Sequence, residues 1–216
     1  MADGTDRRFG ELPLSQTVAA AGAIRRLTGM LLSLEHPHPT VDAMLQKFAQ
    51  WESELEPALP RDPAPRMSGD TPDKRVYVQR ALDIGAFNPC FPEYRFDELG
   101  PETASGTVTF PLAFEGPPGL VHGGFLGVFF DCVIQHQSCA AGVAGKTRSL
   151  TVAYRRPTPL DTELRFDITR AHDERGISAT ARLTRDGEVL CAGQASTVAL
   201  PPERLAPNRF SHRREG

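Results

Sequence analysis

The chain has 216 residues, of which 40% are hydrophobic and 24% charged, and its net charge is −3 at pH 7. This length is enough for one globular domain with a smaller addition. The slightly acidic balance argues against broad nucleic-acid binding and against attraction to anionic membranes. No membrane span is predicted, because the most apolar N-terminal stretch, 18–34, is shorter than the roughly 20 residues a span needs and contains Arg25 and Arg26.

Two features indicate a cytoplasmic protein. The opening MADGTDRRFG leads into polar sequence and not into the apolar core of a secretory signal. The cysteines form no CxxC motif and no metal-ligand cluster, so we predict reduced thiols and no metal site. They are Cys90, Cys132, Cys139 and Cys191.

The N-terminal part, 1–56, is predicted to be a helical hairpin. Within 14–34, apolar residues recur every three or four positions, which indicates an amphipathic helix. The sequence HPHP at 36–39 ends this helix, and Thr40 is expected to cap a second one. The apolar positions are Ala20, Ile24, Leu27, Leu31 and Leu34 in the first helix, and Val41, Met44, Leu45, Phe48 and Leu55 in the second.

The next segment, 57–87, separates this hairpin from the rest of the chain. Its first part, 57–72, contains five prolines and few large apolar residues, which is typical of a linker. Its second part, 74–87, fits a strand or a helix equally well. At the other end of the chain, 201–216 is predicted to be a surface tail.

The main domain, 88–200, is predicted to contain two strands, one buried helix and four further strands. The helix is 123–141, whose length and Ala/Gly content favour a helix over a strand. Asp186-Gly187 between two β-rich segments indicates a hairpin turn. An antiparallel sheet with one hydrophobic helix on a face is an α+β architecture. The predicted strands are 91–98, 104–114, 148–156, 162–171, 177–185 and 188–199.

The predicted buried helix carries one narrow stripe of small and polar residues. Asp131 is the most informative of them, because a carboxylate among Phe, Leu and Val costs several kcal/mol unless it is paired or faces a wet cleft. Close helix packing explains the glycines of the stripe but needs no aspartate, so we expect a ligand or a second subunit at this face. The stripe consists of Gly124, Gly127, Asp131, Gln135, Ser138 and Gly142.

The sequence His122-Gly123-Gly124 lies where this helix is expected to begin. Unpaired N–H groups at a helix N-terminus point outward, and the helix dipole adds positive potential. A thioester or ester carbonyl placed there is polarised, and the oxyanion formed on attack is stabilised. His122 is expected either to orient the carbonyl or to shape the turn.

The segments EGPPGLVHGGFLGVFFD and KTRSLTVAYRRPTPL, which contain these residues, resemble the hotdog-fold acyl-CoA thioesterases, in the branch of PaaI-type enzymes and thioesterase superfamily member four. The resemblance covers 88–200. It implies an antiparallel sheet wrapped around one long central helix, and hydrolysis of an acyl-CoA without a cofactor, since coenzyme A is part of the substrate. It also implies a homodimer or a dimer of dimers whose active sites lie between subunits.

The resemblance also implies residue roles. Asp131 is then the nucleophile or the general base, and the backbone N–H of Gly123 or Gly124 binds the thioester carbonyl. Thr147 helps to hold the acid or the water. One departure concerns Gly116, which lies where several PaaI-type members carry Asn or Gln.

The coenzyme A phosphates would need cations, and Arg suits phosphate oxygens well. We predict that the basic residues after the helix contact coenzyme A and that Gln135 of the polar stripe contacts the substrate. Two alternatives stay open: a non-catalytic acyl-CoA-binding regulatory protein, and a hydratase acting on enoyl thioesters. The basic residues are Lys146, Arg148, Arg155 and Arg156.

Overall fold

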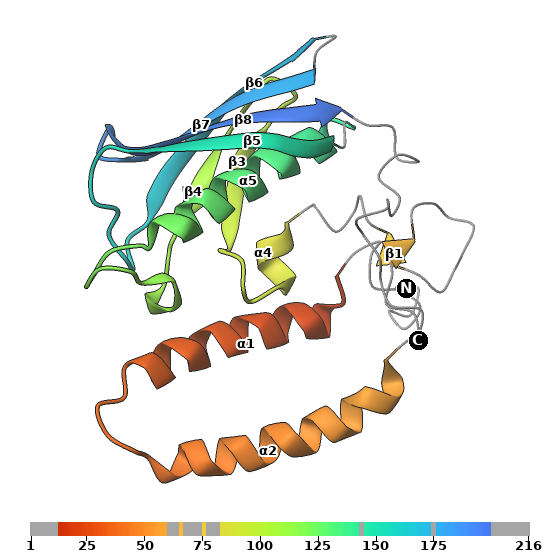
Figure 1. The fold of residues 1–216 in the computed structure, drawn as a ribbon, viewed down its shortest axis with the longest axis vertical. Helices are drawn as coiled ribbons and strands as arrows, with labels where there is room; N and C mark the ends of the chain where they lie inside the picture. Colours follow the sequence, from red (N-terminus) through yellow and green to blue (C-terminus); the bar gives the residue numbers. More distant parts are fainter. Residues whose placement is uncertain are drawn as a thin grey trace.

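The computed structural model describes residues 13–59, 65–66, 75–76, 83–142, 145–173 and 176–199. Its main unit is a six-stranded antiparallel sheet in the order β3-β4-β6-β7-β8-β5, with the long helix α5 against one face (Figure 1). Strands β3 and β5 therefore form opposite edges of the sheet. The α+β prediction of two strands, one helix and four strands is confirmed. The strands are β3 Tyr94–Leu99, β4 Thr103–Val108, β5 Gly145–Tyr154, β6 Leu164–Asp173, β7 Gly176–Arg185 and β8 Glu188–Ala199.

Helix α5, Gly123–Ala140, packs its aromatic and aliphatic side chains into the core of the sheet. Phe129, Phe130 and Val133 are fully buried. Gly193 on β8 makes this close packing possible, because a Cβ there would lie 2.6 Å from the Phe130 ring. The helix ends at Ala140, and Gly142, two residues later, adopts the left-handed conformation with φ of 75° that commonly terminates helices. Gly142 therefore ends the helix, although the sequence pattern placed it on the polar stripe.

One predicted strand boundary is wrong because of proline, and one predicted turn is confirmed. The second strand was predicted over 104–114, but β4 ends at Val108, and a short 3-10 helix, η3 Leu112–Phe114, follows Pro111. Proline has no N–H to donate to a sheet, so the ladder does not continue through it. The Asp186-Gly187 turn is confirmed, with φ of 52° and 80° at the two residues, as a tight hairpin of primed type requires.

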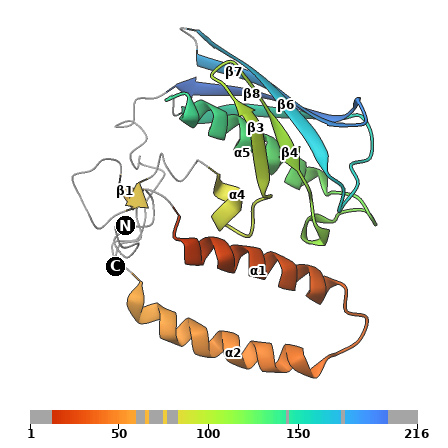
Figure 2. The ribbon, with the colours of Figure 1, turned by 180° about the vertical axis from the view of Figure 1, so that it is seen from behind.

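The N-terminal hairpin is confirmed as α1 Ser15–Leu32 and α2 Pro39–Leu55, and it lies beside the sheet unit with α1 nearer to it (Figures 1 and 2). The second helix begins two residues earlier than predicted. His38, not Thr40, is its cap, and the His38 Nδ1 accepts a hydrogen bond of 3.2 Å from the Thr40 N–H. Pro39 at the first helical position needs no such partner.

Helix α1 docks through a face that the apolar spacing did not indicate. Its buried residues are Ala21 and Arg25, whereas Ile24 and Leu31 of the apolar stripe are exposed. The Arg25 guanidinium donates to the carbonyl of Gly85, to that of Asn88 at 3.3 Å and to the Glu93 carboxylate at 3.0 Å. One buried arginine thus ties the hairpin to the short helix α4, Ile84–Phe87, and to the residue before β3.

The segment between hairpin and sheet is described only in part. The 3-10 helix η2, Glu56–Ala58, continues α2, and the two-residue strands β1 Pro65–Arg66 and β2 Arg75–Val76 pair in parallel. In the segment 74–87, which fitted a strand or a helix, the last four residues form the helix α4. The predicted tail 201–216 lies outside the described residues. No helix in the described part of the chain is long and apolar enough to cross a membrane.

Candidate active site

The predicted stripe on α5 places Asp131 in a hydrogen-bonded cluster at the β5 edge of the sheet. Asp131 is half-buried, and its Oδ1 accepts a hydrogen bond of 2.7 Å from the Thr147 hydroxyl on β5. The Gln135 side-chain amide, one turn further along α5, donates to Thr147 at 2.9 Å and to Thr197 on β8 at 3.2 Å. We call these four residues the Asp131 cluster. It brings together three residues that the sequence singled out and adds Thr197.

Thr197 had no sequence signal of its own. It becomes part of the cluster because the antiparallel pairing of β5 and β8 sets Thr147 directly opposite Thr197. Its side chain is buried, and the sheet register decides its position.

The beginning of α5 contains the second part of the site. His122 is the N-cap, and its Nδ1 accepts a hydrogen bond of 3.0 Å from the Gly124 N–H. The Gly123 N–H has no hydrogen-bond partner among the residues that the structure describes. The two candidate oxyanion donors are therefore not equivalent. His122 occupies the Gly124 donor, and the Gly123 donor is left for a ligand.

Tyr154 at the end of β5 is a residue that the sequence did not single out. Its hydroxyl donates a hydrogen bond of 2.9 Å to the Gly123 carbonyl, and a Cβ at Gly123 would lie 3.0 Å from that hydroxyl. The Gly123–Gly124 peptide group is thus fixed on both sides, by Tyr154 on the carbonyl and by His122 on the N–H. A fixed peptide group keeps the neighbouring free N–H in one direction, which is what a preorganised oxyanion donor needs.

Gly116 has a structural reason for its departure from the family pattern. A Cβ at this position would lie 2.7 Å from the His122 Cα, so no longer side chain fits there while the His122 loop keeps its path.

The four predicted basic residues form two separate pairs. Lys146 and Arg148 lie at the beginning of β5, and Arg155 and Arg156 follow its end. At about 3.3 Å per residue, seven residues of strand separate Arg148 from Arg155 by about 23 Å. Arg156 forms an ion pair of 3.1 Å with Glu188. One chain by itself therefore does not gather these cations into a single patch.

A second polar group on α5 faces the opposite edge of the sheet, and we call it the His136 cluster: His136, Tyr94 and Asp83. The His136 Nδ1 lies 3.0 Å from the Asp83 N–H, which donates to it, and 3.1 Å from the Tyr94 hydroxyl. The Phe96 ring packs edge-on against the imidazole. Burial lowers the pKa of His136 to about 4 and raises the pKa of Tyr94 well above its usual value. Both groups are therefore neutral near pH 7.

The backbone Asp83 N–H can only donate, so the His136 Nδ1 is the acceptor nitrogen of the neutral imidazole, and its partners already occupy it, which indicates a structural role. Burial also raises the pKa of the adjacent Cys132 thiol to about 12, so this cysteine is no thiolate nucleophile at neutral pH. His172 is exposed on β6. No three potential metal ligands lie together in the described ranges.

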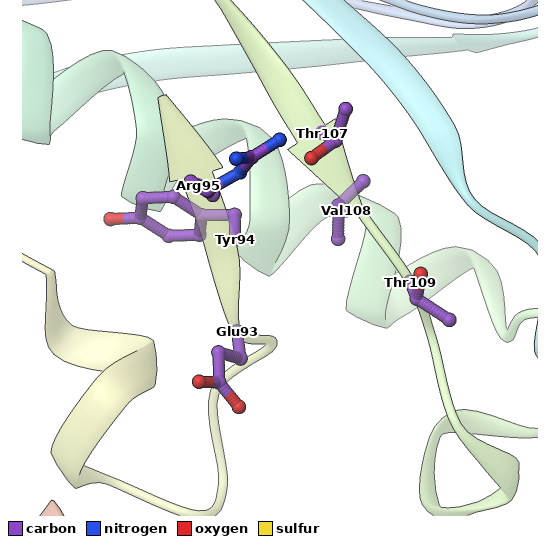
Figure 3. Close-up of a pocket in the computed structure, with 6 residues that line it drawn as sticks. All are labelled: Glu93, Tyr94, Arg95, Thr107, Val108 and Thr109. Carbon is purple, nitrogen blue, oxygen red and sulfur yellow. The ribbon is translucent and has the colours of Figure 1, made fainter. Parts of the chain in front are cut away.

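A shallow hollow of about 260 Å³ lies between the beginning of β3 and the end of β4 (Figure 3). It is smaller than the roughly 300–1,000 Å³ of most ligand pockets. Since β3 and β5 are opposite edges of the sheet, this hollow is not part of the Asp131 cluster. Its lining residues are Glu93, Tyr94, Arg95, Thr107, Val108 and Thr109.

Comparison with known proteins agrees with this fold. No family model matches the chain, and no curated protein matches it. Among solved structures, the crystal structure of protein RHA08564, described as a thioesterase superfamily protein, has a TM-score of 0.70 and 26% identity and covers 88% of this chain and 94% of its own. That coverage extends beyond the sheet unit and α5, which together make up about half of the chain.

Two shorter matches are limited to about half of this chain. A hypothetical thioesterase from Streptococcus pneumoniae, crystallised with coenzyme A, has a TM-score of 0.47 and 18% identity and covers 50% of this chain and 88% of its own. A phenylacetic acid degradation-related protein from Ralstonia eutropha has a TM-score of 0.44 and 23% identity and covers 49% and 83%.

Proposed function

We propose that this chain, which by its structure belongs to the hotdog-fold thioesterase superfamily, hydrolyses an acyl-CoA thioester. The observation that carries the proposal is the combination of an accessible aspartate held by a threonine with an unpartnered N–H at the beginning of the same helix. A thioester is an activated acyl donor, so one carboxylate and one preorganised oxyanion donor suffice for its hydrolysis.

In the proposed reaction, Gly123 stabilises the developing charge and Asp131 acts as base or nucleophile. The Gly123 N–H, aided by the α5 dipole, binds the thioester carbonyl oxygen and stabilises the negative charge that develops on it. Asp131 either takes a proton from an attacking water or attacks the carbonyl carbon itself. In both forms the tetrahedral intermediate collapses by breaking the C–S bond, and the coenzyme A thiolate leaves and is protonated. In the second form, water then hydrolyses the mixed anhydride on Asp131.

The spacing of the two parts supports a site shared between two copies of the chain. Gly123 and Asp131 are eight residues apart on one helix, which corresponds to about 12 Å at 1.5 Å per residue. A single reacting carbonyl cannot lie within about 3 Å of both. We therefore infer that Asp131 of one copy works with Gly123 of another, as in a symmetric homodimer or a dimer of dimers.

Strand β5 offers the surface for this assembly. It is an edge strand that pairs only with β8 among the described strands, and most of its residues are exposed. Antiparallel pairing of two β5 strands about a two-fold axis would place the Thr147 end of one copy beside the Tyr154 end of the other. The same pairing would bring Lys146 and Arg148 near the second copy's Arg155, and the joined cations could bind the coenzyme A phosphates.

The test is thiol release from a panel of short, long and aromatic acyl-CoAs by the purified full chain and by Asp131→Asn. Asparagine keeps the shape of the side chain and cannot act as base or nucleophile, so the rate is expected to fall by at least about 100-fold while the oligomer stays folded. Asp167→Asn is the matched control, because Asp167 is also a half-buried carboxylate but forms an ion pair with Arg182 on the sheet.

Equal rates for wild type and Asp131→Asn across the panel would overturn the catalytic assignment. Binding of acyl-CoA with no turnover would contradict the proposed enzymatic activity and favour the alternative of a regulatory binding protein. A strictly monomeric chain in solution would contradict the shared site.

A further inference from the structure

The hydrogen bonds around Thr147 determine where its single proton goes. A threonine hydroxyl has one proton and two acceptor lone pairs, whereas an amide nitrogen only donates. Because the Gln135 Nε2 lies 2.9 Å from the Thr147 Oγ1, Thr147 is the acceptor in that contact. Its proton is therefore available for the Asp131 Oδ1, which lies 2.7 Å away.

Thr197 helps to hold the Gln135 amide in place. It takes the second contact of the same nitrogen at 3.2 Å, and it is only 2% exposed, so no bulk water competes for this position. If the amide were reversed, the Gln135 oxygen would face both hydroxyls and would draw the Thr147 proton toward itself. Asp131 would then lose the Thr147 donor. A hydrogen bond to a charged carboxylate is stronger than one to a neutral amide oxygen, which favours the observed orientation.

This arrangement makes the two Asp131 oxygens unequal. Oδ1 is occupied by Thr147, and no hydrogen bond to Oδ2 is found among the described residues. We infer that Gln135 and Thr197 are positioning residues that commit the Thr147 proton to Asp131 Oδ1 and leave Oδ2 as the oxygen that meets the water or the thioester carbon. This inference rests on the proposed thioester hydrolysis, and it replaces the predicted substrate contact of Gln135 with a role through Thr147.

The kinetic test uses two single variants and one conservative control. Gln135→Met and Thr197→Val each remove part of the network, and each is expected to lower kcat by roughly three- to tenfold, the effect of one hydrogen bond, with KM changed less than about twofold. Thr197→Ser keeps the hydroxyl and is expected to retain the wild-type kcat. In a Thr147→Val background, Gln135→Met is expected to cause no further loss, because its effect passes through Thr147.

A readout that needs no catalysis separates this inference from the proposed function. Hydrogen exchange of the Gln135 side-chain amide, followed by NMR, is expected to be at least about tenfold slower than that of Gln194, which is exposed on β8. Thr197→Val should remove most of this protection and Thr197→Ser should keep it.

If wild type releases no thiol but the Gln135 amide is protected as expected, the proposed function fails and the network stands. If wild type is active and Gln135→Met raises KM with kcat unchanged, Gln135 is a substrate contact and the inference is overturned. Additive losses in the Thr147→Val background, or an unprotected Gln135 amide, would overturn it as well.

Discussion

The two polar clusters on α5 differ in which atom of the titratable side chain is occupied by protein partners. The Asp131 cluster meets β5 and β8 at one edge of the sheet, and it leaves one carboxylate oxygen without a partner among the residues that the structure describes. The His136 cluster meets β3 at the other edge, and there the Asp83 N–H and the Tyr94 hydroxyl occupy Nδ1, the acceptor nitrogen of the neutral imidazole. A titratable residue on a buried helix therefore indicates a reactive site only when its partners leave an atom free that can accept a proton or attack. Five experiments on the two sides of α5 test this contrast, and the largest effect is expected from Asp131→Asn.

The next largest effect is expected from removing the Gly123 N–H. Gly123→Pro deletes this donor at the first helical position, which tolerates proline, and the extended backbone of His122, with φ of −64° and ψ of 132°, suits the residue before a proline. Loss of an oxyanion donor is expected to lower kcat by roughly 100- to 1,000-fold, measured as thiol release.

Gly123→Ala is the control, because it adds the Cβ beside the Tyr154 hydroxyl and keeps the N–H. It should retain much more activity than Gly123→Pro. Equal losses in the two variants would mean that crowding against Tyr154, and not the missing donor, causes the effect.

Mixing two inactive variants tests whether the two parts of the site come from different chains. Asp131→Asn and Gly123→Pro subunits are unfolded together and refolded in equal amounts, so that about half of the dimers are mixed. Each mixed dimer would have one intact site of two, and the mixture should therefore recover about a quarter of the wild-type rate. No recovery, with mixed dimers demonstrated by mass spectrometry, would place both parts of the site in one chain.

The smallest effect on activity is expected on the His136 side. His136→Leu leaves the Asp83 N–H and the Tyr94 hydroxyl without their acceptor and should lower the free energy of unfolding by about 1–3 kcal/mol. The rate per folded molecule should stay at the wild-type value. His136→Asn offers an acceptor oxygen in place of Nδ1 and should retain more of the stability.

The same residue gives the protein a pH-dependent stability. Burial lowers the His136 pKa from 6.5 to about 4, so between these values the unfolded chain binds a proton that the folded chain does not. The free energy of unfolding should therefore fall as the pH drops from 6.5 to about 4. Denaturant titrations across this range should give a flatter profile for His136→Asn than for wild type, and identical profiles would contradict a neutral, buried His136.

The sequence by itself predicted the succession of strands and helix along the chain, the burial of that helix, and most of the residues now found around Asp131. These features are local: spacing reveals the helix, the Asp-Gly turn reveals a hairpin, and a carboxylate among aromatic residues is conspicuous on any helix. The prediction of the helical hairpin succeeded for the same reason. The face by which α1 docks was not predictable, because a buried arginine that bonds to backbone carbonyls has no apolar signature.

Only the tertiary structure decided which atoms of the candidate site are free. The pairing of β5 with β8 brought Thr197 to Gln135, and the end of β5 brought Tyr154 to Gly123, across separations in sequence that no local pattern spans. The structure also divided the basic residues into two pairs at opposite ends of β5. Sequence spacing determines what a helix or strand can present, whereas register and packing determine which donor meets which acceptor, since hydrogen bonds depend on distances of a few tenths of an ångström.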